Sequence, residues 1–206
     1  MKTLLKFILL ASCIFLLSFT PNKEKTIIVI DAGHGGNDFG AVIDIHSEKE
    51  IVAAITNKIL LLNPHSNIEI HTTRTTNQLV SLQERVAVIN QIKPDLVISL
   101  HTNRSKNEAI NGMECFVFDQ SNTYIQSQNL AVSLLNELTE ITTLEKRSIK
   151  TAPFYILKNT EAPAILVELG FLSNKNDLNY LTNEDNQSKI ALGILNFAST
   201  IKNNRP

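Results

Sequence analysis

Hydrophobic residues fall in short runs along the chain, separated by longer stretches in which they recur every three or four positions. Short runs are typical of buried strands, and the longer spacing is typical of helices that pack one face against a core. The runs that we predict to be strands are Thr26–Asp31, Ile68–Thr72, Leu96–Leu100, Met113–Phe118, Phe154–Leu157 and Ala164–Leu169. The stretches that we predict to be helices are Ser47–Leu62, Leu79–Ile92, Tyr124–Glu140 and Asp185–Ile201.

This alternation of strands and helices predicts an α/β fold. Strands that alternate with helices form βαβ units, so we expect a mainly parallel twisted sheet of about six strands with helices on both faces. The chain has 206 residues, which suits a single domain with a substantial core. In such sheets, ligands bind where the carboxyl ends of the strands meet.

The N-terminal segment differs in character from the rest of the chain. Two lysines precede an apolar run from residue 7 to residue 19, and polar residues follow. The run is short for a membrane span and is typical of a secretory signal. We therefore predict a signal peptide at residues 1–20, a linker at residues 21–25 and a folded domain at residues 26–206. The mature chain would be exported, to the periplasm or the cell wall, and an uncleaved membrane anchor or lipidation at Cys13 are the alternatives.

Charge and cysteine content restrict the partners and the metal ligands. The formal net charge is -1, and without the signal the domain is slightly more acidic, so it lacks the basic surface that nucleic-acid binding needs. After signal cleavage Cys115 is the one remaining cysteine, which excludes an intrachain disulfide and a cysteine-based zinc site. Any metal ion would need histidine and carboxylate ligands. We expect a monomer.

Polar residues that suit such a site follow three of the predicted strands. His34 comes after the first strand, in "IVIDAGHGG", His101 comes after the third, in "VISLHTN", and Glu168 ends the last, in "AILVELGFLSN". On the first stretch alone, a tight turn with an incidental histidine is an equally good interpretation. Two histidines and a carboxylate at one sheet edge favour a functional site, because a buried unpaired charge is costly.

A fourth group comes from the start of the first predicted helix. Ser47 and Glu50 have the spacing of a capping box, which gives Glu50 a structural role and leaves Glu48 free to face the strand ends. His46 is a competing ligand. Two histidines and one carboxylate match the ligand set of catalytic zinc sites, which leave a fourth position for water. A separate carboxylate must then accept the proton of the water, and Glu168 is the candidate.

These motifs resemble the zinc-dependent N-acetylmuramoyl-L-alanine amidases, which cut peptide stems from the glycan chains of peptidoglycan. The resemblance runs from about residue 26 to residue 201, so it identifies residues 26–206 as a zinc amidase catalytic domain. The matching segments, in chain order, are "IVIDAGHGG", "GAV", "EKE", "TTR", "LQERVAVIN", "DLVISLHTN" and "FYILKNTEAPAILVELGFLSN".

The resemblance also implies roles for individual residues. One Zn²⁺ would be held by the three ligands His34, Glu48 and His101, and Glu168 would be the catalytic glutamate. Asn103 and Arg147 stand at family-like positions and are candidates for substrate contact, although a solvated turn and a surface charge explain them at least equally well. We expect Arg74 and Arg85 to pair with acidic groups that hold the fold.

The resemblance implies hydrolysis of the amide between N-acetylmuramic acid and L-alanine. The alternatives are a zinc peptidase acting on stem peptides and a catalytically inactive peptidoglycan-binding module. Some family members carry an inserted helix that plugs the zinc site until an activator removes it. Only about five polar residues follow the strand at Met113–Phe118, which leaves no room for such a helix, so we predict an open zinc site. A recruiting or activating protein is possible, but the sequence does not identify it.

Overall fold

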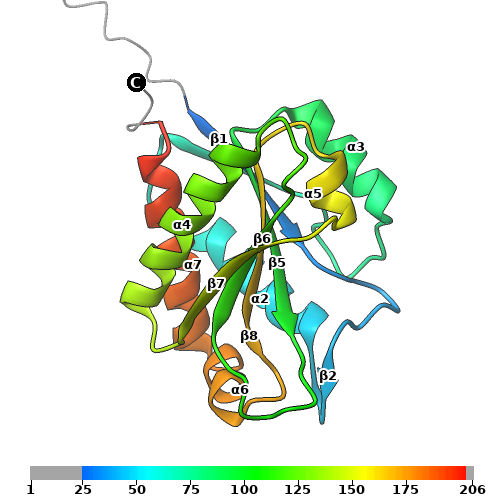
Figure 1. Cartoon of the computed structure of the whole chain (residues 1–206), viewed down its shortest axis with the longest axis vertical. Coiled ribbons are helices and arrows are strands. Elements are labelled where there is room, and N and C mark those ends of the chain that lie inside the picture. The colour runs from blue at the N-terminus through cyan, green and yellow to red at the C-terminus, as the bar shows by residue number, and fades with distance from the viewer. Residues whose placement is uncertain (1–24, 203–206) are drawn as a thin grey trace, which may run out of the picture.

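Six strands form one sheet in the order β4-β1-β5-β8-β6-β7 in the computed structural model, which describes residues 25–202 (Figure 1). The strands β4, β1, β5 and β8 run parallel, β6 is antiparallel to β8, and β7 is parallel to β6. The predicted α/β fold with a mainly parallel sheet is confirmed. The strands are β1 (Thr26–Ala32), β4 (Ile68–Thr72), β5 (Leu96–Asn103), β6 (Met113–Val117), β7 (Lys146–Thr151) and β8 (Ala164–Phe171).

Helices cover both faces of this sheet, and the two faces bury separate hydrophobic clusters. Residues Ile28 and Ile30 of β1 face the larger cluster, whereas Val29 faces the smaller one, because successive side chains of a strand point to opposite faces. The larger cluster is covered by α2 (Glu48–Leu62), α4 (Tyr124–Ile141) and α7 (Glu184–Thr200). The smaller cluster is covered by α3 (Leu82–Ile92) and α5 (Tyr155–Asn159) (Figure 1).

One predicted strand is wrong. Most of Phe154–Leu157 lies in the short helix α5, where Ile156 and Leu157 pack into the smaller cluster. A run of only four apolar residues fits a buried strand and a helical turn equally well, so the pattern could not separate the two.

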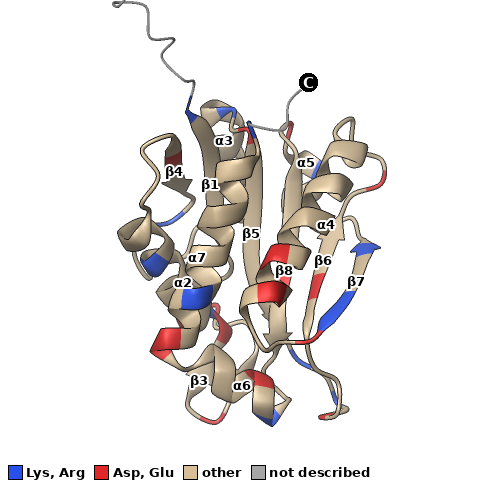
Figure 2. Cartoon of the chain, turned by 90° about the vertical axis from the view of Figure 1, so that its left-hand side faces the viewer, with Lys and Arg blue, Asp and Glu red and all other residues tan. Residues whose placement is uncertain are grey.

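Four elements were not predicted. The strand β7 is exposed and carries Lys146, Arg147 and Lys150, so it lacks the hydrophobic signal of a buried strand (Figure 2). Charged side chains are common on edge strands, where they prevent pairing with other chains. The other three elements are the strands β2 (Val42–Ile43) and β3 (His46–Ser47), which form a small hairpin, and the helix α6 (Lys175–Leu181).

The start of one helix and the capping of another differ from the prediction. Helix α3 begins at Leu82, not at Leu79, because Ser81 and Glu84 form a capping box. The capping box predicted at Ser47 does not form: the Ser47 hydroxyl donates to the Glu50 carboxylate at 2.8 Å and accepts no bond from the helix. Helix α2 nevertheless begins at Glu48, which is the position predicted for this residue.

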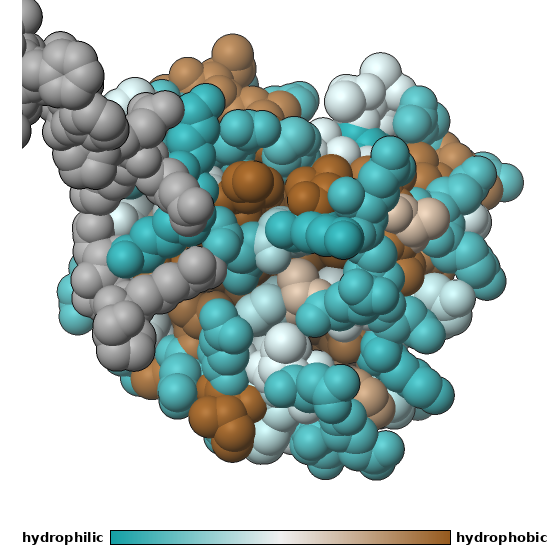
Figure 3. Space-filling view, turned by 90° about the horizontal axis from the view of Figure 1, so that it is seen from above, coloured by the Kyte–Doolittle hydropathy of each residue, from teal (hydrophilic) through white to brown (hydrophobic). Residues whose placement is uncertain are grey.

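The carboxyl ends of the four parallel strands meet at one edge of the sheet, next to the β2–β3 hairpin and α6 (Figure 1). The opposite end, seen in Figure 3, shows hydrophobic side chains surrounded by hydrophilic ones. The predicted signal peptide at residues 1–20 and the alternative lipidation at Cys13 lie outside the described residues. Within residues 25–202, no helix is both long enough and apolar enough to cross a membrane.

Candidate active site

His34, Glu48 and His101 lie together at the carboxyl edge of the sheet, with their potential ligand atoms all within 4.8 Å of one another. Glu48 Oε1 lies 3.0 Å from His34 Nε2 and 2.8 Å from His101 Nδ1. The loop after β1, the first turn of α2 and the end of β5 each supply one of these residues. His46, the competing candidate, lies in β3 and is not part of this cluster.

Backbone donors hold the Glu48 carboxylate in place. Oε1 accepts from the amide of Thr102 at 3.0 Å, and Oε2 accepts from the amide of Ala41 at 2.8 Å. Glu48 is 4% exposed, so its charge is almost fully removed from water. Buried charges need such compensation, and here two amides and two imidazoles provide it.

The glycines near His34 allow the close approach of these groups. A Cβ at Gly33 would lie 2.4 Å from the His101 ring, and a Cβ at Gly40 would lie 2.4 Å from Glu48 Oε2. His34 itself has a φ of 59°, a left-handed conformation that is uncommon outside glycine. Asp38 Oδ2 accepts a hydrogen bond from His34 Nδ1 at 2.8 Å, and the other ring nitrogen, Nε2, then faces Glu48. Asp38, four residues after His34, was not predicted to be a site residue.

Two buried arginines hold the backbone of the His34 loop. Arg74 donates to the carbonyls of Ala32 and Gly33, both at 3.0 Å. Arg85 donates to the carbonyls of Ala32 at 2.6 Å and His34 at 2.5 Å. Three successive carbonyls are therefore fixed by two guanidinium groups, which sets the direction of the loop.

The prediction that both arginines pair with acidic groups holds for Arg85 and is wrong for Arg74. Arg85 forms an ion pair with Asp31 at 2.8 Å, whereas the hydrogen bonds that Arg74 makes with described residues all go to backbone carbonyls. The sequence shows the charge of an arginine but not its partner, so this role could not have been predicted.

Glu168 belongs to a row of charged residues that crosses three strands. It pairs in register with His101 of β5 on one side and with Glu114 of β6 on the other. Glu114 is buried and accepts from Lys150 at 2.7 Å and from Arg147 at 3.2 Å. By strand alternation the row shares the face covered by α3 and α5, which lie toward the other end of the sheet (Figure 1). The row therefore lies on a part of the sheet that these helices leave open.

Glu168 is the carboxylate of this row without a fixed partner. Its Oε2 is buried and makes no hydrogen bond to any residue within 25–202. Burial raises the pKa of Glu168 to about 7, against the lowering effect of His101. Burial alone would lower the pKa of His34, but the Glu48 and Asp38 carboxylates raise it to about 9. Burial also opposes ionisation of Glu48, yet bonds from His101 and His34 hold its pKa well below the usual range.

The two predicted substrate-contacting residues lie near the row and have partners within the protein. Asn103 Nδ2 is 3.4 Å from Glu114 Oε1, and Asn103 Oδ1 accepts from the amide of Arg104. Arg147 donates to Glu114 and to the carbonyl of Asn111, and its side chain is 34% exposed. Both residues are therefore within the site region and held in position there.

The fold and the site define the class: an α/β domain with a His–Glu–His cluster and an unpartnered glutamate at the carboxyl ends of parallel strands. The sequence profile described as N-acetylmuramoyl-L-alanine amidase matches residues 28–199. The chain belongs to the N-acetylmuramoyl-L-alanine amidase family, whose reaction is hydrolysis in the cell-wall peptidoglycan.

Individual relatives agree with this assignment. The chain is 32% identical to a putative N-acetylmuramoyl-L-alanine amidase of Buchnera aphidicola, over 82% of this chain and 92% of the relative. A crystal structure of N-acetylmuramoyl-L-alanine amidase from Clostridium difficile 630 has a TM-score of 0.83 at 27% identity, covering 89% of this chain and all of the other. The CwlD amidase from Clostridioides difficile, in complex with the GerS lipoprotein, has a TM-score of 0.79 at 28% identity and covers 87% and 99%.

Proposed function

We propose that this chain is a zinc-dependent hydrolase that cleaves the amide between N-acetylmuramic acid and L-alanine in peptidoglycan. One Zn²⁺ would be held by His34, Glu48 and His101, and Glu168 would be the general base. The observation that carries the proposal is the grouping of these three ligand types within 4.8 Å beside the unpartnered carboxylate of Glu168. Membership of the amidase family indicates which bond is cleaved.

The residues present fit a zinc ion. Two imidazoles and one carboxylate are the ligand set of many catalytic zinc sites, which keep one position open. The Asp38 carboxylate at His34 Nδ1 is a typical outer partner of a zinc-binding histidine, because it fixes the ring and its tautomer. Side-chain exposures of 22% for His34 and 21% for His101 show that solvent reaches the two rings.

Bound zinc supplies Lewis-acid chemistry, polarising the scissile carbonyl and lowering the pKa of water. The residues of the chain do the rest. Glu168 accepts a proton as the water oxygen bonds to the lactyl carbonyl carbon, and it then delivers that proton to the L-alanine nitrogen as the C–N bond breaks. The products are the lactyl carboxylate and a stem peptide with a free amino terminus. Asn103 and Arg147 would contact substrate next to Glu168.

The proposal extends to location and partners. The charged and apolar pattern of residues 1–20 supports export, to the periplasm or the cell wall, which is where peptidoglycan lies. We propose that the enzyme acts as a monomer. The complex of the related CwlD amidase with a lipoprotein supports the idea that a recruiting or activating protein exists for this chain as well.

Digestion of purified peptidoglycan by residues 21–206 tests the proposed function, with mass identification of the products. We expect free stem peptides that begin with L-alanine, together with unsubstituted glycan. A chelator should abolish product formation, and added Zn²⁺ should restore it. Shortened stems that stay attached to glycan would instead identify a peptidase. Binding to peptidoglycan without any product would identify an inactive binding module.

A further inference from the structure

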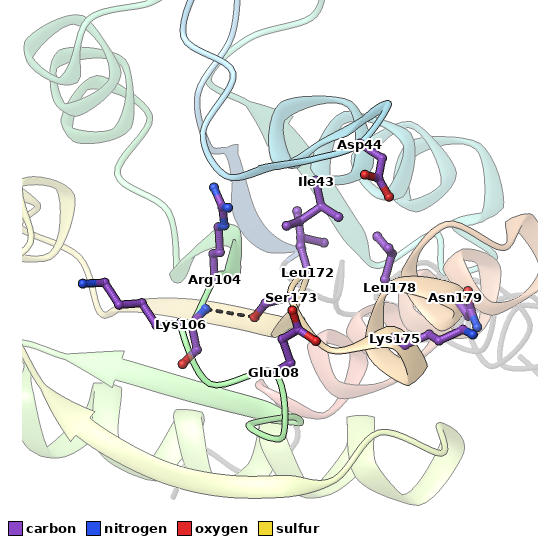
Figure 4. A pocket seen from close by; sticks show the side chains of 11 residues that line it. Ile43, Asp44, Arg104, Lys106, Glu108, Leu172, Ser173, Lys175, Leu178 and Asn179 are labelled. Carbon is purple, nitrogen blue, oxygen red and sulfur yellow. Dashed lines mark hydrogen bonds between the residues drawn. The ribbon is translucent and has the colours of Figure 1, made fainter.

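A pocket of about 880 Å³ lies at the same edge of the sheet as the His–Glu–His cluster (Figure 4). Three segments line it: the β2–β3 hairpin, the loop that follows β5, and the segment that leads from the end of β8 into α6. None of the roles proposed above uses the residues of this pocket.

The residues that line the pocket are close in sequence to the residues of the proposed active site. The hairpin residue Ile43 lies five residues before Glu48, and Arg104 lies three residues after His101. Leu172 lies four residues after Glu168. Each of the three segments that carry active-site residues therefore continues into one wall of the pocket.

Hydrogen bonds between the walls hold the pocket in shape. The amide of Ser105 donates to Ser173 Oγ at 2.9 Å, which joins the loop after β5 to the end of β8. Asn174 Nδ2 donates to the carbonyl of Glu108 at 2.8 Å, which joins the same loop to the start of α6. Most small-ligand sites are largely formed before the ligand binds, and this pocket meets that condition.

The lining combines a small apolar centre with charges of both signs. Figure 4 shows Ile43, Leu172 and Leu178 in the middle, Arg104 to one side and Lys175 to the other. The acidic residues Asp44 and Glu108 stand above and below this centre. Among the residues that line the pocket there is no aromatic side chain on which a sugar ring could stack. The lining therefore suits a peptide with short aliphatic and charged groups better than it suits the glycan.

We infer that this pocket binds the peptide stem of the substrate, with the carboxylates of the stem placed at Arg104 and Lys175. The inference rests on the proposed function, which puts the L-alanine amide at the His–Glu–His cluster. Each extended residue spans at most about 3.3–3.6 Å, so a stem of four or five residues reaches well beyond three residues of chain from His101. An acidic residue follows L-alanine in peptidoglycan stems, and a diamino acid at the third position would meet the acidic residues of the pocket.

The test uses soluble muramoyl peptides and the variants Arg104→Ala, Lys175→Ala and the double variant. The expected result is a KM about three- to tenfold higher for the double variant with kcat unchanged, because exposed charge pairs contribute modestly to binding. Lys158→Ala is the matched control, since Lys158 is an exposed lysine of α5 outside the pocket. A second substrate carries an amide in place of the carboxylate on the second residue of its stem. For this substrate, the difference in KM between wild type and double variant should be smaller.

The free stem peptide gives a readout that does not depend on turnover. Titration of the wild-type protein with this peptide, followed by nuclear magnetic resonance, should shift signals of the pocket residues, and the double variant should bind it more weakly. Cleavage of the muramoyl amide with the same KM in wild type and double variant would overturn the inference and leave the proposed function intact. Peptide binding in the pocket of a wild-type protein that cleaves no muramoyl amide would overturn the proposed function instead.

Discussion

At the scale of residues, the proposed function gives separable roles to the three clustered side chains and to Glu168. We predict that His34→Ala and His101→Ala abolish stoichiometric zinc binding, because each removes one of three ligands. Glu168→Gln should keep the zinc and lower turnover about a hundredfold or more, the usual effect of losing a general base. Metal analysis of each purified variant and the rate of stem release provide the two measurements.

The matched control for this prediction is Glu161→Gln, which changes an exposed glutamate in the loop before β8 and should alter neither measurement. Loss of zinc from Glu168→Gln would contradict the division of roles. It would show that Glu168 is itself a ligand.

Residue positions at strand ends could be predicted from the sequence, whereas partners across the fold could not. His34, His101 and Glu168 stand out because polar groups end apolar runs. The role of Arg74 depends on carbonyls of a loop more than 40 positions away, which no local pattern reveals. The row that joins Glu168 to Glu114 depends on β6 pairing with β8, and that pairing is set by the topology of the sheet.

At the scale of elements, the first turn of α2 separates two neighbouring glutamates. Glu48 faces the two histidines, whereas Glu50 is exposed and accepts a bond from Ser47. We predict that Glu48→Ala weakens zinc binding, while Glu50→Ala costs only about 0.5–1.5 kcal/mol of stability, the typical net value of one hydrogen bond. Zinc titration and chemical unfolding of both variants measure these effects. The reverse pattern would move the ligand from Glu48 to Glu50.

Asp31 joins several elements beneath the His34 loop. It is the second-last residue of β1 and accepts from Arg85 of α3, from Thr73 after β4 and from Ser99 of β5. Burial would raise the pKa of Asp31, but Arg85 and the two hydroxyls together hold it below its usual range. A carboxyl group with a lowered pKa stabilises the fold above its unfolded pKa, and this contribution is lost as the pH falls through the folded pKa.

We therefore predict that Asp31→Asn lowers the free energy of unfolding at pH 7 by about 3–5 kcal/mol, because it leaves the buried Arg85 without its counter-ion. Below a pH of about 4, protonation of Asp31 should lower the free energy of unfolding of the wild type, so the difference in this free energy between the two proteins should become smaller. Chemical unfolding between pH 7 and pH 3 measures it. Glu140→Gln, an exposed control on α4, should stay within about 0.5 kcal/mol of wild type. A difference that stays constant with pH would contradict the account.

At the scale of the whole molecule, hydrophobic periodicity predicted the elements that are buried and missed those that are not. The central strands and the long helices have strong patterns because both sides of the sheet are covered. The edge strand β7 is exposed along most of its length, and the helix α6 is only seven residues long. The start of α6 does carry a local signal, since Asn174 accepts from the amides of Asn176 and Asp177 as an N-cap.

The course of the chain between β6 and α4 determines whether the active site can be blocked from within that segment. Only residues 118–123 connect the two elements, and they form turns closed by the bonds Ser121 N to Phe118 O and Tyr124 N to Ser121 O. An additional helix of three turns would need about 11 residues. Helix α4 itself packs into the core through Ala131, Leu134, Leu135 and Leu138, so it is not free to cover the site.

We therefore predict that the mature protein with zinc releases stem peptides from purified peptidoglycan without any activator. The partial exposure of both histidine rings is consistent with a site that substrate reaches directly. The assay compares the protein alone with the protein plus periplasmic extract, and Glu168→Gln in the same extract corrects for other hydrolases. An increase of only a few-fold would agree with a site that is open in the resting protein. If the protein alone had negligible activity and the extract raised it about a hundredfold, the prediction would be contradicted. A partner in the extract would then control the activity of the described fold.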